Sequence, residues 1–391
     1  DDYFNCLTVG SVMRPVTDGH KISRAKLAYL IDATAAPVCM IAPVSSWAAA
    51  VSGVAADLGT GVSGIELFVR AIPYNFYSLL TFVFIIGLAV MQFDYGPMKL
   101  HEMNAMLNGE LGAQETEDAQ EGNPRGRVLD LVLPVAVLIV SCVIGMIYVG
   151  GYFGVDAWGG TDYAGDFIGA FGNTDAFISL PWGALIALVL TIIYMIARRL
   201  MTFKEAMACV PKGFIAMVPP ITILTLAVSL KTMTGMLGAD VYVRDLMYGA
   251  AEGLFNLLPA VIFVVACLLA FASGTSWGTF GILIPIVVNV FEPGSTLLTI
   301  GISACLAGAV CGDHCSPISD TTIMASAGAQ CDHVTHVSTQ LPYAITVAAV
   351  SFVSFIIAGF VQNAVICLLV GALLTVGTLF VIRSVTSKKA A

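Results

Sequence analysis

Long apolar runs separated by shorter polar segments dominate the chain. Charge-free runs lie at 33–56, 71–93, 131–155, 176–197 and 293–312, with a shorter one at 213–230. All but the shortest could cross the roughly 30 Å of a bilayer core as a helix. Two more runs, 253–291 and 337–382, are too long for one crossing, so we expect each to fold back as a hairpin or helix pair.

The pattern predicts an all-α integral membrane protein with about nine or ten transmembrane passes, including re-entrant hairpins and broken helices. A membrane β-barrel would instead show short segments of alternating polarity. Composition agrees, because 58% of the residues are hydrophobic and 11% are charged, against about 25% charged in a soluble domain. The net charge of −9 excludes a nucleic-acid partner, since no basic stripe could neutralise phosphates. We expect the lipid bilayer to be the chain's main surroundings.

Lysine and arginine indicate the orientation of the connections. The 198–212 connection carries four basic residues and is predicted to be cytoplasmic, whereas 151–175 carries four aspartates and no basic residue and is predicted to be external. The 99–130 connection is predicted to be a cytoplasmic linker, with an acidic stretch at Gln114–Glu121. The basic C-terminus is also expected inside.

The most polar stretch beside apolar runs is Cys311–Tyr343. Pro317 cannot donate a backbone hydrogen bond and disfavours helical dihedrals in the residue before it, so a helix arriving from 304–310 should break near Ser316. A broken helix frees carbonyls, which with hydroxyls and a carboxylate can coordinate a small cation. We therefore interpret the stretch as a monovalent-cation site. The alternative is a solvated polar loop between two helices.

Two further polar interruptions could complete such a site. Ala272–Phe280 breaks the 253–291 run with two glycines and a cluster of hydroxyls. Ser45-Ser46-Trp47 similarly interrupts the 33–56 run. We predict that both are re-entrant tips, because glycine lets the backbone approach an ion and hydroxyls supply ligands. The alternative reading is that these small residues only allow close helix packing.

Two titratable residues are candidates for proton handling. Asp32 opens an otherwise charge-free run, where a carboxylate is costly unless it binds a cation or a proton. His314 neighbours Asp313 and could titrate near neutral pH, or it could be a hydrogen-bonded strut. The cysteines and histidines lack the spacing of a structural zinc site, so no structural metal is expected.

The chain shows signs of an internal duplication. Asp2–Met13 aligns with Asp313–Met324 and, after a three-residue shift, Asp18 aligns with Asp332 and Tyr29 with Tyr343. Repeat-built transporters place their sites where the repeats meet, although a chance match is the alternative. The basic residues near 14–26 and their absence from 325–343 predict an inverted repeat, but the basic C-terminus points the other way. The orientation of the 253–336 region stays open.

The sequence contains no nucleotide-binding or hydrolase motif, so transport would be driven by ion gradients. We expect no cofactor. An intramembrane aspartyl enzyme is an alternative, although hydroxyl-rich surroundings favour cation coordination over a carboxylate dyad. The chain begins at Asp1 with no initiator methionine, and we expect it to be a fragment whose upstream part is missing.

Two long motifs carry a family resemblance. The segments GTSWGTFGILIPI (274–286) and GDHCSPISDTTIMASAGAQCDHVTHVSTQLPYA (312–344) closely resemble the NhaC-type sodium:proton antiporters. Residues 1–51 and FDYGPM (93–98) look like first-half motifs of the same family. The resemblance implies a transporter rather than an enzyme. Such a transporter would exchange cytoplasmic Na+ or Li+ for external H+ across a bacterial inner membrane. Some relatives couple this exchange to malate or lactate, so an organic-acid antiporter is the main alternative.

The candidate site follows from the cation-site interpretation and the resemblance together. The ion-binding candidates are Asp313, Ser316, Ser319, Asp320, Thr321, Thr322, Thr275 and Ser276. The candidates for proton handling are Asp313, His314, Asp320 and Asp32. The first-half candidates are Asp2, Asn5, Thr8, Ser45 and Ser46.

The domain organisation predicted is one antiporter membrane domain over residues 1–391. Its first repeat half is 1–98 and is incomplete at the N-terminus, the linker is 99–130, and 131–391 holds the remaining helices with the second half. The preferred cation, the stoichiometry and the oligomeric state stay open, with a homodimer as one alternative.

Overall fold

The structure is a computed structural model that describes residues 2–55, 64–113, 125–237 and 255–388. The chain is 78% helical, and no β-strand occurs in these ranges, which confirms the all-α fold. It forms two compact units. The first unit comprises Asp1–Ala42, Arg70–Thr116 and Ala227–Ala391, and the second comprises Pro43–Val69 and Glu117–Leu226. The acidic stretch Gln114–Glu121 lies outside the described residues.

The first unit holds most of the helices and every predicted ion-binding residue. Its elements are α1 (Asp2–Gly19), α2 (Arg24–Ala33), α3 (Ala36–Cys39), η1 (Ile72–Tyr74), α6 (Phe76–Met91), α7 (Gly96–Asn108), α14 (Leu258–Ser273), α15 (Ser276–Val290), α16 (Thr296–Cys315), α17 (Asp320–Ala329), α18 (His333–Val361) and α19 (Ala364–Lys388).

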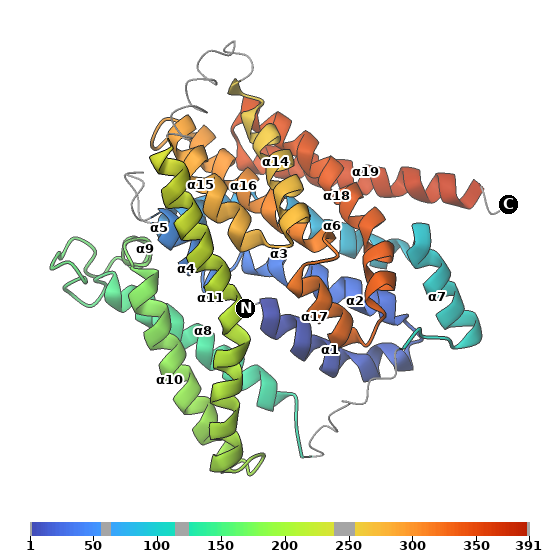
Figure 1. Cartoon of the computed structure of the whole chain (residues 1–391), viewed down its shortest axis with the longest axis horizontal. Coiled ribbons are helices and arrows are strands. Elements are labelled where there is room, and N and C mark those ends of the chain that lie inside the picture. Colours follow the sequence, from blue (N-terminus) through green and yellow to red (C-terminus); the bar gives the residue numbers. More distant parts are fainter. Residues whose placement is uncertain (1, 56–63, 114–124, 238–254, 389–391) are drawn as a thin grey trace. The chain divides into compact units, whose positions relative to one another are not determined.

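The second unit is built around a helical hairpin. Its elements are α4 (Ser46–Ala55), α8 (Leu129–Val149), α9 (Phe167–Gly172) and α10 (Ala176–Ala197). The helices α8 and α10 pack side by side, as the green ribbons of Figure 1 show. Two helices run from one unit into the other along the chain: α5 (Gly64–Ala71) and α11 (Phe203–Met236).

Five described helices are long and apolar enough to cross a membrane. They are Leu129–Val149, Ile178–Ala197, Thr296–Cys315, His333–Val361 and Ala364–Thr386. The pair Gly64–Tyr74 and Phe76–Met91, bent by 43° at its break, would make a sixth. The chain is therefore a multi-pass membrane protein, while the figure of nine or ten passes remains a prediction.

The helix α16 lies at the centre of the first unit. It packs against α14, α15 and α18 (Figure 1), and 83% of its apolar window is buried, against 17% for α10. Small residues make this burial feasible. A Cβ atom on Gly308 would lie 2.4 Å from the Phe263 carbonyl oxygen, and one on Gly312 would lie 2.1 Å from that of Cys267. Only glycine lets the α14 backbone approach this closely, as in membrane helix pairs with small residues four apart.

Several predicted apolar runs divide differently in the structure. The 253–291 run breaks between α14 and α15 and the 337–382 run breaks between α18 and α19, as expected. The 33–56 run is not one crossing helix, because α3 and α4 are separated at residues 40–45. Pro43 explains this break, since its ring disfavours a continuous helix. The basic 198–212 connection is shorter than predicted, because α11 already begins at Phe203.

The two aligned segments of the predicted repeat pack together but differ in backbone. A Cβ atom on Gly10 of α1 would lie 2.3 Å from the carbonyl oxygen of Gly328 in α17. Tyr29 and Tyr343, which the alignment pairs, lie edge to face with ring centroids 5.0 Å apart. The first copy is one continuous helix, whereas the second breaks, because Cys6 stands where the second copy has Pro317. The inverted repeat itself stays a prediction.

Candidate functional site: two helix breaks around Asp313

The helix break predicted near Ser316 is present. The helix α16 ends at Cys315, Ser316 is extended with φ −80° and ψ 129°, and α17 begins at Asp320. Two contacts fix the break. Ser316 Oγ donates to the Phe271 carbonyl at 2.8 Å, and His333 Nε2 lies 2.7 Å from the Pro317 carbonyl oxygen. The polar stretch is therefore packed into the first unit, and the side chains of Asp313, Ser316 and Ser319 are buried.

A second break lies against the first. Between α14 and α15, Gly274 adopts φ +64°, a conformation that favours glycine, and Thr275 caps α15 by accepting a hydrogen bond from Gly278 N. A Cβ atom on Gly274 would lie 2.7 Å from the side chain of Ile318 and 2.9 Å from its carbonyl oxygen. The hydroxyl-rich tip and the broken helix predicted from sequence thus meet.

The carboxylate of Asp313 lies at this meeting point and is 3% exposed. Ser276 Oγ donates to Asp313 Oδ2 at 2.6 Å. The other oxygen, Oδ1, is buried with no hydrogen-bond partner among the described residues. A buried carboxylate oxygen without a partner is costly, so a bound proton or cation would stabilise it.

Hydroxyls and a second carboxylate surround the break. Ser319 Oγ and Thr321 Oγ1 lie 2.9 Å apart, and Thr322 Oγ1 is buried with no partner in the described part of the chain. Asp320 begins α17 at the same break and is half-buried. Hard oxygen donors are the ligands that small cations prefer. Among the predicted ion ligands, Ser276 thus contacts Asp313, and Ser319 contacts Thr321 at the adjoining break.

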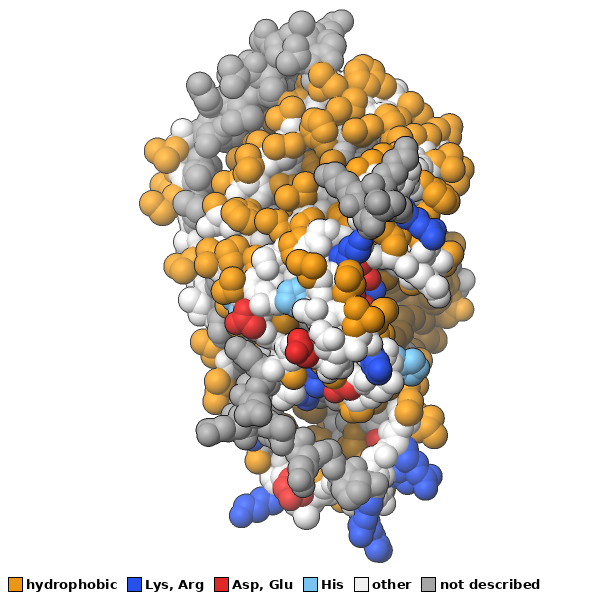
Figure 2. All heavy atoms as spheres, turned by 90° about the vertical axis from the view of Figure 1, so that its right-hand side faces the viewer, with side chains coloured by type: hydrophobic (Ala, Val, Ile, Leu, Met, Phe, Trp, Pro, Cys, Tyr) orange, Lys and Arg blue, Asp and Glu red, His pale blue; other side chains and the backbone are white. Residues whose placement is uncertain are grey.

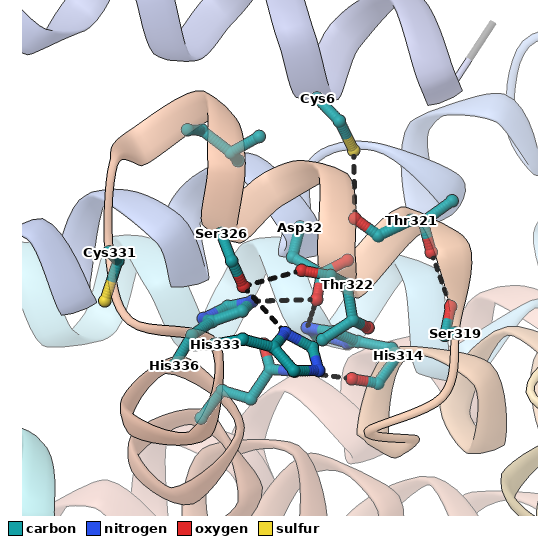
Figure 3. Close-up of polar contacts among 12 residues, drawn as sticks. Cys6, Asp32, His314, Ser319, Thr321, Thr322, Ser326, Cys331, His333 and His336 are labelled. Carbon is teal, nitrogen blue, oxygen red and sulfur yellow. Dashed lines mark hydrogen bonds and ion pairs between the residues drawn. The ribbon is translucent and has the colours of Figure 1, made fainter. Parts of the chain in front are cut away.

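A second buried polar group lies beside the first and joins α2, α16 and α18. Asp32 Oδ2 lies 3.2 Å from His336 Nε2 and 4.0 Å from His314 Nε2. Figure 3 shows the Asp32 carboxylate between these two rings. On its far side, His314 Nδ1 lies 2.9 Å from the hydroxyl of Tyr77. The structure therefore brings together Asp32 and His314, which the sequence analysis chose separately.

The first-half candidates are more scattered. Asp2 is buried, and Asn5 Nδ2 donates to the Ile31 carbonyl at 3.2 Å, which ties α1 to α2. Ser45 belongs to the second unit, where its hydroxyl accepts a hydrogen bond from Ala48 N and so caps α4. The side chains of Thr8 and Ser46 lie outside the described ones. Among these candidates, the role of Asn5 and Ser45 in the described structure is to hold helices in place.

The helix α18 supplies partners that the sequence did not predict. Neither His336 nor Gln340, whose side chain donates to the His314 carbonyl at 2.7 Å, is among the residues predicted for the site. A signal was present. Four buried polar or aromatic side chains recur on one helical face of an apolar segment: His336, Thr339, Gln340 and Tyr343. A polar stripe of period 3.6 inside a membrane helix indicates a face turned to the protein interior.

Comparisons with known proteins show a family match over most of the chain. Residues 27–360 match the Na+/H+ antiporter family. The chain is 38% identical to an uncharacterised protein of Haemophilus influenzae over 369 residues, which cover 93% of this chain and 69% of that protein.

Two named transporters match over shorter stretches. A malate-2H(+)/Na(+)-lactate antiporter of Bacillus subtilis is 29% identical over 137 residues, or 35% of this chain and 29% of that protein. The arginine/ornithine antiporter ArcD of Halobacterium salinarum is 35% identical over 111 residues, or 27% and 23%. The chain thus spans less than a third of either transporter.

No solved structure matches the chain. The matched range, residues 27–360, includes both helix breaks and the Asp32 group. The chain belongs to the Na+/H+ antiporter family.

Proposed function

We propose that the chain exchanges cytoplasmic Na+ or Li+ for external H+, with the cation bound at Asp313 between the two helix breaks. The observation that carries this proposal is the buried Asp313 Oδ1, which has no partner in the described structure and lies among hydroxyls. A carboxylate in such a site is stable when it binds either a metal cation or a proton. The family match supports a transporter over an intramembrane aspartyl enzyme.

Exclusive occupancy would couple the two ions. Deprotonated Asp313 binds Na+ when the site is open to the cytoplasm, and protonation from outside expels it. An ion that bound equally well to the inward-open and the outward-open site would not drive transport of the other ion. Coupling therefore requires that Na+ and H+ not occupy the site together. Asp320 supplies a second carboxylate at the same break.

The Asp32 group is proposed to hold the proton between the site and water. Its carboxylate lies next to two imidazoles, and one of these continues to the Tyr77 hydroxyl. His314 also follows Asp313 directly in α16. A chain of titratable groups in contact is the arrangement that proton pathways in membrane proteins use.

Flux measurements on carboxylate variants test the proposal. Asp313→Asn and Asp320→Asn in everted vesicles should each abolish Na+-dependent proton efflux. The neutral amide of asparagine cannot alternate between a protonated form and an ionised form that binds Na+. The matched control is Asp332→Asn, which changes a nearby carboxylate at the start of α18 and keeps its capping oxygen. Wild-type efflux in Asp313→Asn would remove this residue from the mechanism.

A second candidate function keeps the site but adds an organic anion as cargo. The similarity of 137 residues to a malate-2H(+)/Na(+)-lactate antiporter favours it. Lys231, a basic candidate for binding such an anion, has a side chain outside the described ones. Stimulation of Na+ flux by malate or lactate in proteoliposomes would support this function, and unchanged flux would favour simple cation–proton exchange.

A further inference from the structure

A cavity of about 260 Å³ opens on the surface of the first unit beside α7. Its wall is formed by the segment after α6, by α7 and by the end of α19, and it includes Asp94 and Glu102. Figure 2 looks at the side from which α7 and the end of α19 project in Figure 1, and shows charged side chains of both signs there among hydrophobic ones. One water occupies about 30 Å³ in the liquid, so the cavity has room for a hydrated monovalent cation.

The cavity lies on the predicted cytoplasmic side of the membrane. The connection that follows α6 and the basic C-terminus are both predicted to be inside. The apolar span of α19 ends at Thr386, and this residue lines the cavity. The cavity is therefore placed where the site must open to receive cytoplasmic Na+.

Tyr343 of α18 lies directly behind the cavity wall. Its hydroxyl donates to Asp94 Oδ1 at 2.6 Å, while Asp94 Oδ2 accepts a hydrogen bond from Lys26 Nζ at 2.8 Å. The Tyr343 ring is fully buried, with ring centroids 5.4 Å from Phe84 and 4.7 Å from Tyr95. Asp94 thus joins the cavity to a tyrosine that is held from several sides.

The Asp32 group lies behind Tyr343. Tyr29 packs edge to face on Tyr343 with ring centroids 5.0 Å apart, and it also stacks on His314 at 6.2 Å. His314 Nε2 in turn lies 4.0 Å from Asp32 Oδ2. Tyr29 is 2% exposed and Tyr343 is 0% exposed. Two aromatic rings therefore close the route from the cavity to the Asp32 group.

The helix α18 is weakened at the residue before Tyr343. Pro342 lies inside the helix and has no N–H group, so the helical hydrogen bond to the Ser338 carbonyl is missing. The Tyr95 hydroxyl donates to the Pro342 carbonyl at 3.3 Å, which ties this turn to the segment before α7. Helices bend most readily at proline. The turn that carries Tyr343 can therefore move at a lower cost than a fully bonded turn.

We propose that this cavity is the cytoplasmic mouth of the transport pathway and that Tyr343, anchored by Asp94, is the residue that closes it. The proposal rests on the proposed exchange for its cargo, a monovalent cation or a proton. When Tyr343 moves away from Tyr29, water from the cavity reaches His314, which directly follows Asp313 in α16. When Tyr343 is in place, the site is closed to the cytoplasm, as an exchanger requires while its site faces the other side.

Thiol labelling behind Tyr343 tests the proposal without measuring transport. In a full chain whose native cysteines are replaced, His336→Cys places a thiol beside Asp32. Everted vesicles present the cytoplasmic side to a small, cationic, membrane-impermeant methanethiosulfonate. We expect Tyr343→Phe to raise the labelling rate about tenfold, because the closed state loses one hydrogen bond to the Asp94 carboxylate. Tyr343→Ala should raise it further, because the ring is removed as well.

Phe355→Ala is the matched control. It removes another fully buried ring of α18, which packs on Phe76 and Phe263 and does not line the cavity. Its labelling rate should equal that of the parent chain. The proposal is overturned if Tyr343→Ala labels at the parent rate, if Phe355→Ala labels as fast, or if the rise appears only from the external side. A chain that labels as expected but shows no sodium counterflow keeps the route and fails the exchange.

Discussion

At the residue scale, the hydroxyl of Ser276 is what holds the Asp313 carboxylate. It donates to Oδ2 at 2.6 Å and leaves Oδ1 available for a ligand. Hydrogen bonds to charged groups contribute about 1.5–3 kcal/mol. Ser276→Ala should therefore raise the Na+ concentration for half-maximal exchange by about tenfold or more, without abolishing exchange. Ser338→Ala, at an exposed hydroxyl of α18, is the control. An unchanged Na+ dependence in Ser276→Ala would contradict this role.

The cap of α18 gives a stability prediction with a pH dependence. Asp332 Oδ2 accepts a hydrogen bond from Thr335 N at 2.8 Å, and this backbone N–H is the main cause that lowers the pKa of the Asp332 carboxyl. When the pKa of a carboxyl is lower in the folded than in the unfolded protein, its ionised form stabilises the fold at pH values above the unfolded pKa, which is near 4. This stabilisation is lost as the pH falls further, through the folded pKa.

Two variants separate the charge from the cap. Asp332→Ala should cost about 1 kcal/mol at pH 7, whereas Asp332→Asn, which caps nearly as well, should cost little. Thermal unfolding in detergent at pH 7 and at pH 3.5 measures both. The difference between wild type and Asp332→Ala should shrink at the lower pH, because a protonated carboxyl accepts the Thr335 N–H hydrogen bond more weakly. A constant difference across this range would show that the ionised carboxylate does not contribute.

At this scale, the sequence could predict a structural feature where residues close in the chain cause it, and not where distant helices must pack together. Pro317 breaks the helix by its own chemistry, so the position of the break followed from one residue. Asp313 and Ser276 lie 37 residues apart. Both could be predicted as ion-binding residues, because each lies in a polar interruption of its own apolar run. The contact of Asp32 with His336, across 304 residues, depends on how α2 and α18 pack. Neither local sequence shows that packing.

At the element scale, the close packing of α14 on α16 positions Asp313. Gly312 immediately precedes it, and a Cβ atom there would meet the Cys267 backbone at 2.1 Å, which cannot move aside as a side chain could. Gly312→Ala should lower the free energy of unfolding by about 1–3 kcal/mol, as overpacking does. Gly377→Ala in α19 is the control, because nothing lies within 4 Å of its added Cβ.

The control is expected to unfold at the same temperature as the wild type or slightly higher, since alanine favours helix over glycine. Thermal unfolding of the two purified variants checks the pair. Equal stability of Gly312→Ala and the wild type would mean that α14 and α16 can separate without cost, and the position of Asp313 would then not depend on their packing.

Helix lengths were only partly predictable. Hydropathy located the apolar runs but not the positions of the breaks within them. A charge-free segment has the same hydropathy whether it forms one helix or two. The 33–56 run shows this, since it contains α3, an interruption and α4. Glycine and hydroxyl clusters were the better guide, as at Gly274-Thr275 between α14 and α15.

At the scale of the whole molecule, α10 should place its two flanking connections on opposite sides of the membrane. Trp158 lies in the aspartate-rich connection before it, and Lys204 lies in the basic 198–212 segment after it. In a chain whose native cysteines are replaced, Trp158→Cys should react with a membrane-impermeant thiol reagent in intact cells. Lys204→Cys should react only after permeabilisation. Labelling of both positions from outside would contradict the predicted orientation.

The exchange of one ion for another at Asp313 is the central claim, and counterflow of radioactive sodium tests it most directly. Proteoliposomes loaded with unlabelled Na+ and diluted into tracer should accumulate the tracer with the wild-type chain. The rate should fall as the pH of both compartments is lowered, because protons then occupy the carboxylate. Asp313→Asn should show no accumulation at any pH. Accumulation by Asp313→Asn at the wild-type rate, with the same pH dependence, would contradict the account.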